Sequence, residues 1–232
     1  MGDEKNIQAV ILAAGRGTRM YPLTKDTPKS LQMVNGKTLI EWKLAVLPSE
    51  VKDVILVIGH QGNQIKDYLG DSWGGRTIRY AVQEDLNGTA GALLSAKPLL
   101  GERFLVMMGD DLYAKEDIRR LIALPWGVCV SRVHNKAMGG EMLVDDKGNF
   151  VGIREEKHLV SDGLVNTGLY VLGHEILDIP PVPIGGTSGE FGLPHTLAVI
   201  AKHIPVPLVI TEHWMQITGP DDLIRAQKYF LR

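Results

Sequence analysis

The chain has 232 residues, 44% hydrophobic and 22% charged, with 25 Lys plus Arg against 27 Asp plus Glu and a formal net charge of −2. This composition excludes a disordered or fibrous chain, and the near-neutral charge gives no electrostatic footprint for DNA or RNA. The only cysteine, Cys129, lies in an apolar run, which excludes a disulfide framework and predicts a small buried residue. The charged first residues are unlike a signal peptide and no apolar run could span a membrane, so we expect a soluble cytoplasmic protein with no membrane or nucleic-acid partner.

Short apolar runs closed by turn residues alternate with segments of helical spacing in the first part of the chain. The apolar runs predict buried strands at residues 7–14, 54–59, 77–82, 104–108 and 128–133. Helical spacing and helix-boundary residues predict helices at 39–47, 61–69, 89–97 and 115–124. This alternation predicts an α/β fold: a doubly wound, mostly parallel sheet covered by helices.

The pattern changes after about residue 137. The turn Asp146-Lys147-Gly148 predicts a hairpin between strands at 142–145 and 149–153. Further strands are predicted at 164–172 and 207–211, helices at 193–202 and from Pro220 onward, and an irregular, mobile stretch at 180–192. We expect a single domain over 1–232, with one part at about 1–136 and a β-rich part at about 137–232 that includes an insertion covering a cleft and the closing helix.

The first strand ends in the glycine-containing run Gly15-Arg16-Gly17-Thr18-Arg19. A dinucleotide-binding loop would need a third glycine where Met20 stands, so that pattern fails. A P-loop ending at Gly36-Lys37-Thr38 lacks its first glycine and fails as well. Lys37 and Thr38 are therefore predicted to form a loop and a helix start. A third interpretation is a turn whose backbone N–H groups bind phosphate, with the two arginines of the run and Lys29 as counter-charges. The alternative is a tight turn with solvated basic side chains.

A longer set of motifs supports the phosphate-binding interpretation. The segment 12–20, followed by Pro22-Leu23-Thr24 and Thr27-Pro28-Lys29, resembles the signature of the sugar-1-phosphate nucleotidylyltransferases, such as glucose-1-phosphate uridylyl- and thymidylyltransferases and the pyrophosphorylase domain of N-acetylglucosamine-1-phosphate uridylyltransferase. Further motifs follow in the family's order: Gln83 with Gly88-Thr89-Ala90, Gly109-Asp110, Glu155 with Lys157, and Asn166-Thr167-Gly168. The resemblance runs from residue 7 to about 230. It implies a Rossmann-like nucleotidyltransferase and a Mg²⁺-dependent reaction of a pyrimidine nucleoside triphosphate, UTP or dTTP, with a sugar 1-phosphate, which gives a nucleotide sugar and pyrophosphate.

The resemblance also implies roles for individual residues on the nucleotide side. Arg19 and Lys29 would be catalytic, because they would clamp the triphosphate and stabilise the charge of the transition state and of the leaving pyrophosphate. The amide of Gln83 would read uracil or thymine, since it both donates and accepts hydrogen bonds. The residues implied to bind the nucleotide are Leu12, Ala13, Ala14, Gly15, Gly17, Thr18, Gln83, Gly88 and Thr89.

The resemblance places the metal at Asp110, a carboxylate at the end of a buried strand, where Mg²⁺ would find the oxygen ligand that it prefers. Its neighbour Asp111 would assist or cap the turn. Many relatives carry a second metal-binding aspartate where this chain has Gln216, so we expect Gln216 to be a weaker ligand and the Mg²⁺ affinity to be lower.

The resemblance places the sugar phosphate at Gly140, Glu155, Lys157 and Asn166. Glu156 competes with Glu155, since adjacent residues of a strand face opposite sides and only one of the pair should point into the cleft.

Other features leave alternatives open. The segment Gly189-Glu190-Phe191-Gly192-Leu193-Pro194-His195 stands where relatives usually read Leu-Thr-Asp, so His195 would contact substrate or, as we favour, be structural. No hexapeptide repeat follows, so we expect a stand-alone transferase domain. The sequence leaves three points open: which sugar is used, whether the nucleotide is UTP or dTTP, and whether the chain forms a homo-oligomer. The alternatives are a cytidylyltransferase acting on a non-sugar phosphate such as phosphocholine, and a non-catalytic regulatory protein that binds a nucleotide sugar, a possibility that Gln216 raises.

Overall fold

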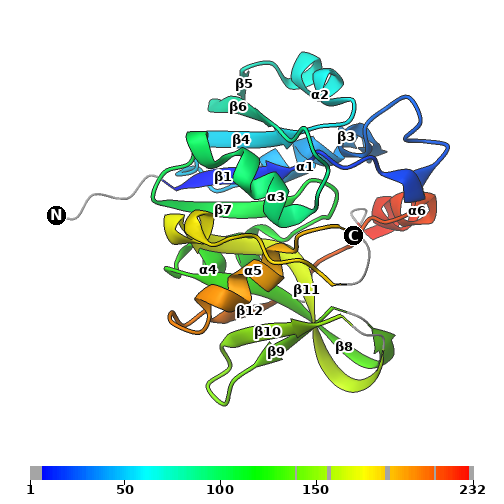
Figure 1. The fold of residues 1–232 in the computed structure, drawn as a ribbon. Coiled ribbons are helices and arrows are strands. Elements are labelled where there is room, and N and C mark those ends of the chain that lie inside the picture. The colour runs from blue at the N-terminus through cyan, green and yellow to red at the C-terminus, as the bar shows by residue number, and fades with distance from the viewer. Residues whose placement is uncertain (1–6, 139, 156–157, 186–188, 212, 230–232) are drawn as a thin grey trace.

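The computed structural model describes residues 7–138, 140–155, 158–185, 189–211 and 213–229, and the backbone alone for 135–138, 158–160 and 229. Four parallel strands form the centre of a ten-stranded sheet, in the order β7-β1-β4-β6 (Figure 1). These strands are β1 (Gln8–Leu12), β4 (Asp53–Ile58), β6 (Arg76–Val82) and β7 (Arg103–Met108). The predicted parallel sheet is therefore confirmed, and it places the carboxyl ends of these strands along one edge.

The second part of the chain extends this sheet instead of forming another. Strand β11 (His158–Gly173) pairs antiparallel with β7 and with β8 (Gly127–Met138), and β12 (Leu208–Thr211) lies parallel to β8. The hairpin of β9 (Glu141–Val144) and β10 (Phe150–Arg154) forms as predicted and joins the sheet through β11. Strands β8 and β11 are longer than the predicted 128–133 and 164–172, because they pair with each other well beyond the apolar core.

Helices cover both faces of the sheet. They are α1 (Leu39–Val46), α2 (Gly62–Leu69), α3 (Thr89–Ser95), α4 (Lys115–Ile122), α5 (Leu193–Ile200) and α6 (Pro220–Tyr229). Successive β1 residues alternate between two cores: Val10 packs in the core that contains α3 and α5, and Ile11 in the core that contains α1, α2 and α4. Burial on both faces explains why this strand reads as a continuous apolar run.

The segment between β1 and α1 contains short regular elements. They are the 3-10 turns η1 (Thr18–Met20) and η2 (Lys29–Leu31) and the strands β2 (Met33–Val34) and β3 (Lys37–Thr38). The predicted start of α1 is confirmed, because the Glu41 amide donates to Thr38 Oγ1 over 3.2 Å and the Thr38 amide to Glu41 Oε2 over 2.8 Å, a capping box. The remaining short elements are β5 (Ser72–Trp73), η3 (Lys97–Leu99), which replaces the end of the helix predicted at 89–97, and η4 (His174–Asp178).

Among the described residues, no helix has the length and apolarity needed to cross a membrane. Cys129 is a free, buried thiol, as the apolar run predicts, and burial raises its pKa to about 12.

The end of β1 and the start of the loop after it are held by β4 on one side and by the loop after β7 on the other. The amide of Ala13 donates to the Val57 carbonyl over 2.8 Å, and the amide of Gly109 donates to the Leu12 carbonyl over 2.9 Å. A Cβ at Gly109 would lie 2.7 Å from the Leu12 oxygen, and one at Gly59 would lie 2.9 Å from a backbone oxygen of the same loop. Glycine is therefore required at both positions for the loops to approach this closely.

Substituting Gly109→Ala should lower the free energy of unfolding by about 1–3 kcal/mol, because the new methyl group overlaps a backbone oxygen that cannot move freely. Denaturant titration measures the change. Gly15→Ala in the same loop is the matched control, since nothing lies within 4 Å of its added Cβ, and its stability should stay within about 0.5 kcal/mol of the wild type. Equal effects of the two substitutions would contradict this account of the loop packing.

Candidate active site

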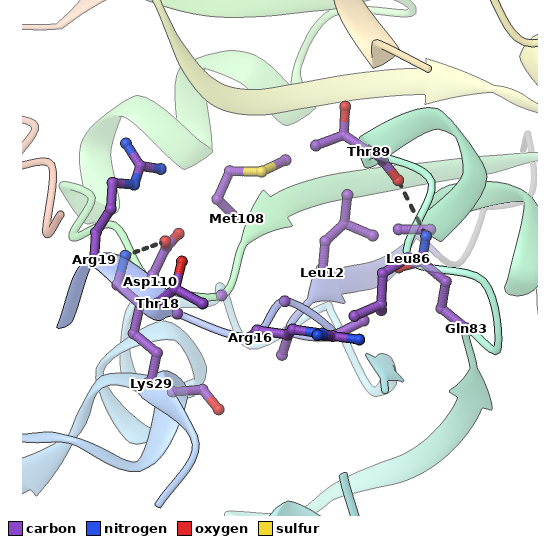
Figure 2. Close-up of a pocket in the computed structure, with 18 of the residues that line it drawn as sticks. Leu12, Arg16, Thr18, Arg19, Lys29, Gln83, Leu86, Thr89, Met108 and Asp110 are labelled. Atoms are coloured by element: carbon purple, nitrogen blue, oxygen red, sulfur yellow. Dashed lines mark hydrogen bonds and ion pairs between the residues drawn. The ribbon is translucent and has the colours of Figure 1, made fainter. Parts of the chain in front are cut away.

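A cavity of about 590 Å³ lies at the carboxyl ends of the central strands. Figure 2 shows Arg19, Lys29 and Asp110 on one side of it and Gln83, Leu86 and Thr89 on the other. The structure brings together here every residue predicted to bind the nucleotide and both predicted catalytic residues: Leu12, Ala13, Ala14, Gly15, Gly17, Thr18, Arg19, Lys29, Gln83, Gly88 and Thr89. The cavity thus has a basic end and an end lined by amide and apolar groups.

The turn at the basic end depends on Gly17. Its φ of +62° is left-handed, and a Cβ there would lie 3.1 Å from Lys29 Cβ, so a side chain would be strained by both the backbone and its neighbour. The Thr24 hydroxyl donates to the Gly17 carbonyl over 2.7 Å and fixes the turn. This geometry brings Lys29 from η2 under the glycine loop.

Two basic side chains, Arg19 and Lys29, lie at this end of the cavity, whereas the Arg16 side chain extends toward Leu86 on the other side (Figure 2). Lys29 Nζ lies 2.5 Å from Asp110 Oδ2, and the lysine side chain is 11% exposed. Arg16 and Arg19 are exposed, and within the described ranges neither guanidinium has a protein partner. The unpaired guanidinium of Arg19 beside a lysine–aspartate pair, with a second unpaired guanidinium, Arg16, further along the cavity, makes a site that attracts an anion.

Gln83 is buried at the other end of the cavity. Its Nε2 donates to Asn87 Oδ1 over 3.1 Å and to the Gly88 carbonyl over 3.2 Å, so the side-chain oxygen stays available as an acceptor. Gly88 has a φ of +98°, and a Cβ there would lie 2.5 Å from the Phe191 carbonyl oxygen. Glycine at this position therefore allows the loop before α3 to pack directly on the segment before α5.

A second cavity of about 300 Å³ adjoins the first, and Thr89 and Met108 line both. Gly140, Glu155 and Asn166, three of the four predicted sugar-phosphate residues, line the second cavity. The fourth, Lys157, lies outside the described residues, as does Glu156. Glu155 lines the second cavity, and the prediction that only one of the two adjacent glutamates points into the cleft stays a prediction.

Asn166 is fixed by a bulge in β11. Its Nδ2 donates to the Tyr170 hydroxyl over 2.6 Å and its Oδ1 accepts from the Gly168 amide over 3.0 Å. A Cβ at Gly168 would lie 2.3 Å from Met108 Cγ, so this glycine makes room for the methionine that separates the two cavities. One N–H of the Asn166 amide is left for a ligand.

Asp111 is buried and anchors a distant segment. It accepts hydrogen bonds from Trp214 Nε1 over 3.1 Å and from the Ile217 amide over 3.3 Å. Burial, and then the neighbouring Asp110, raise the pKa of Asp111 to about 7. Both hydrogen bonds favour the structural role that the sequence left open, and they draw Gln216 to the second cavity beside Asp111.

The structure brings Asp110 and Gln216, the two predicted metal ligands, to different cavities. Asp110 lines the first, where its side chain is 37% exposed, and the exposed Gln216 lines the second. In the described part of the chain, no group of three or more His, Cys, Asp or Glu side chains could hold a metal ion. The donor set therefore fits a metal held by one carboxylate and by oxygens of a bound phosphate, as Mg²⁺ often is.

Lys43 is a charged residue near the site that the sequence analysis did not single out. It is fully buried on α1, with Nζ 3.5 Å from the Leu39 carbonyl oxygen and 5.8 Å from the centre of the Tyr113 ring. Burial lowers its pKa to about 8, while Asp111 and Asp110 act in the opposite direction. The sequence contains a signal for this burial, because Lys43 stands four residues after Leu39 and therefore on the apolar face of the helix.

His195 lies in the second cavity, although the sequence favoured a structural role. Its Nε2 is 3.5 Å from Glu155 Oε1, and its side chain is 13% exposed. Nδ1 is buried and has no hydrogen-bond partner among the described residues. Desolvation lowers the pKa of His195, and the charge of Glu155 opposes this shift.

Comparisons with known proteins bear on the family and the fold of this chain. Among curated relatives, the bifunctional protein GlmU of Methanocaldococcus jannaschii is 26% identical over 226 residues, which are 97% of this chain and 54% of GlmU. The D-glycero-alpha-D-manno-heptose 1-phosphate guanylyltransferase of Campylobacter jejuni is 29% identical over 74% of this chain and 78% of its own length. A solved structure of UDP-glucose pyrophosphorylase with UDP-glucose is 19% identical and shares the fold, with a TM-score of 0.80 over 97% of this chain and 98% of that one.

This chain spans about half the length of the GlmU relatives that it matches. Its residues 8–228 match the family described as nucleotidyl transferase, which covers the central sheet, both cavities and most of α6. The chain therefore belongs to the nucleotidyl transferase family.

Proposed function

We propose that this chain catalyses a Mg²⁺-dependent reaction of UTP or dTTP with a sugar 1-phosphate, giving a nucleotide sugar and pyrophosphate. The observation that carries the proposal is the pair of adjoining cavities, one with a basic end and one with hydrogen-bonding side chains, which share Thr89 and Met108. Two substrates bound side by side in this way would meet at the shared wall, and such positioning supplies much of the catalysis in phosphoryl and nucleotidyl transfer.

The reaction needs positioning and charge neutralisation more than a strong base. A phosphate oxygen of the sugar 1-phosphate attacks the α-phosphorus of the triphosphate, a new P–O bond forms, and the bond from the α-phosphorus to the bridging oxygen breaks, so that pyrophosphate leaves with the electron pair. The nucleophile is already an anion. Arg19 and Lys29 would bind the triphosphate and stabilise the charge that develops on the leaving pyrophosphate.

Asp110 is the residue we propose to hold Mg²⁺, because its carboxylate lies at the basic end of the first cavity. A bound Mg²⁺ would neutralise charge on the phosphate oxygens. Lys29, now paired with Asp110 at 2.5 Å, would then be free to turn toward the phosphates. Gln216 would contribute at most a neutral oxygen from the neighbouring cavity.

The choice of a pyrimidine base rests on Gln83. Its amide hydrogens are used within the protein, and its free oxygen would accept a hydrogen bond from the N3–H that both uracil and thymine carry. The heptose 1-phosphate guanylyltransferase among the relatives makes GTP the alternative to test.

The substrates can be identified by crossing UTP, dTTP, CTP, ATP and GTP with glucose 1-phosphate, N-acetylglucosamine 1-phosphate, mannose 1-phosphate and phosphocholine, and measuring pyrophosphate release. We expect release with UTP or dTTP and a sugar 1-phosphate, and loss of release when EDTA replaces Mg²⁺. Release with phosphocholine and CTP alone would support the cytidylyltransferase instead. Binding of UTP without release in any combination would support a non-catalytic nucleotide-binding protein.

Arg19→Ala should lower kcat by about 100- to 1000-fold, the usual effect of removing one preorganised charge-stabilising group. Because the Arg19 side chain is exposed and has no partner among the described residues, the melting temperature should change little. Steady-state kinetics and thermal unfolding measure the two effects. Arg119→Ala, on the exposed face of α4, is the matched control and should leave both unchanged. A large loss of stability in Arg19→Ala would instead make Arg19 structural.

Gln83→Glu should raise the KM for the pyrimidine triphosphate by about tenfold or more, since the carboxylate cannot donate to Asn87 or to the Gly88 carbonyl and places a charge beside them. The KM for the sugar phosphate should change less than twofold. The neighbouring exposed Glu84, changed to Gln, gives the control for altered charge at this strand end. An unchanged KM for the triphosphate would remove Gln83 from base recognition.

A further inference from the structure

We propose that His195 helps to determine which sugar 1-phosphate is used, because its imidazole donates a hydrogen bond to the same sugar hydroxyl group from which Glu155, the residue that the family resemblance assigns to the sugar, accepts one. The inference rests on the proposed function and adds a specificity-determining residue, His195, to it. Both side chains line the second cavity.

The distance between the two groups leaves room for a ligand to bond to both. His195 Nε2 and Glu155 Oε1 are 3.5 Å apart, longer than the 2.7–3.2 Å of an ordinary N–H···O hydrogen bond. Each group therefore keeps its full capacity for a third partner. A hydroxyl group suits this arrangement, because it donates one hydrogen bond and accepts others at the same time.

The imidazole ring is held firmly in this position. The α5 helix that carries it begins where the Leu193 amide donates to Thr89 Oγ1 over 2.9 Å and the Gly192 amide donates to the Val182 carbonyl over 3.0 Å. A Cβ on Gly192 would lie 2.2 Å from His195 Nδ1, so the ring lies directly against that backbone. Specificity requires such fixed groups, since a mobile side chain adapts to several ligands.

The proton of the neutral ring belongs on Nε2. The buried Nδ1 has no partner among the described residues, whereas Nε2 faces the carboxylate of Glu155. Partial burial lowers the pKa of His195, which favours the uncharged ring at neutral pH. The ring therefore presents one N–H donor toward the cavity, beside an acceptor.

Asn166 complements the pair. Its Oδ1 accepts from the Gly168 amide and one amide hydrogen goes to the Tyr170 hydroxyl, so its second N–H is left as a donor for the ligand. Glu155 adds a stronger, charged acceptor beside this donor, and its carboxylate favours an uncharged sugar ring over a uronic acid. The second cavity can therefore distinguish sugars by the direction of a single hydroxyl.

The test compares His195→Leu and His195→Gln with the wild type in steady-state kinetics, using the sugar 1-phosphate that gives the most pyrophosphate. We expect the KM for this acceptor to rise about tenfold or more in His195→Leu, which has no donor, and to be largely restored in His195→Gln, whose amide nitrogen reaches about as far as Nε2. The KM for the triphosphate should change less than twofold. His203→Leu, at an exposed histidine just after α5, is the matched control and should change neither KM.

Monodeoxy analogues of the same sugar 1-phosphate identify the hydroxyl group. In the wild type, one analogue should lose about tenfold or more in kcat/KM, and in His195→Leu the same analogue should lose little beyond the parent sugar. If His195→Leu fails to fold, Glu155→Gln should show the same non-additive pattern.

Equal changes of both KM values, no rescue by glutamine, or additive losses with every analogue would overturn the inference while leaving the proposed function intact. A folded wild type that releases no pyrophosphate with any acceptor would overturn the proposed function first, and this inference with it.

Discussion

The close packing of three loops at the carboxyl ends of β1, β4 and β7 is the constraint on which the rest of the site depends. The end of β1 and the loop after it lie between Gly59 and Gly109. A Cβ added to Gly59 would lie less than 3 Å from the Ala14 oxygen, and one added to Gly109 less than 3 Å from the Leu12 oxygen. Because no side chain separates them, the glycine loop, Asp110 and Lys29 meet at one point of the sheet edge. Parallel strands place their carboxyl ends together, and ligands of open α/β sheets bind at that edge.

Two ionisable side chains are buried near this site. Asp111 and Lys43 are both removed from water, and burial shifts the pKa of each toward its uncharged form, up for the acid and down for the base. Such groups contribute little to net stability, but losing one partner leaves the other uncompensated. Asp111 uses its hydrogen bonds to hold Trp214 and Ile217, and this brings a segment a hundred residues away to the edge of both cavities.

The two cavities are mechanically connected as well as adjacent. The loop before α3 packs on Phe191 at Gly88, and Thr89 accepts the amide hydrogen of Leu193 at the start of α5. The helix that carries His195 is thus positioned by the same loop that lines the first cavity. If two substrates occupy the cavities, as we propose, this connection would fix their relative orientation and lower the entropic cost of bringing them together.

The sequence alone determined the features that arise from neighbours along the chain. The apolar run at 7–14, the helix start at Thr38 and the glycine turn at 15–17 are local patterns, and motif spacing identified most of the residues that line the first cavity. The tertiary structure decided what depends on contacts between distant segments. The lengths of β8 and β11 come from their pairing with each other, and the burial of Lys43, the anchoring by Asp111 and the meeting of His195 with Glu155 come from the packing of helices and strands far apart in sequence. A charged or polar residue looks the same in a sequence whether water or the protein surrounds it, and only the fold establishes which partner it has.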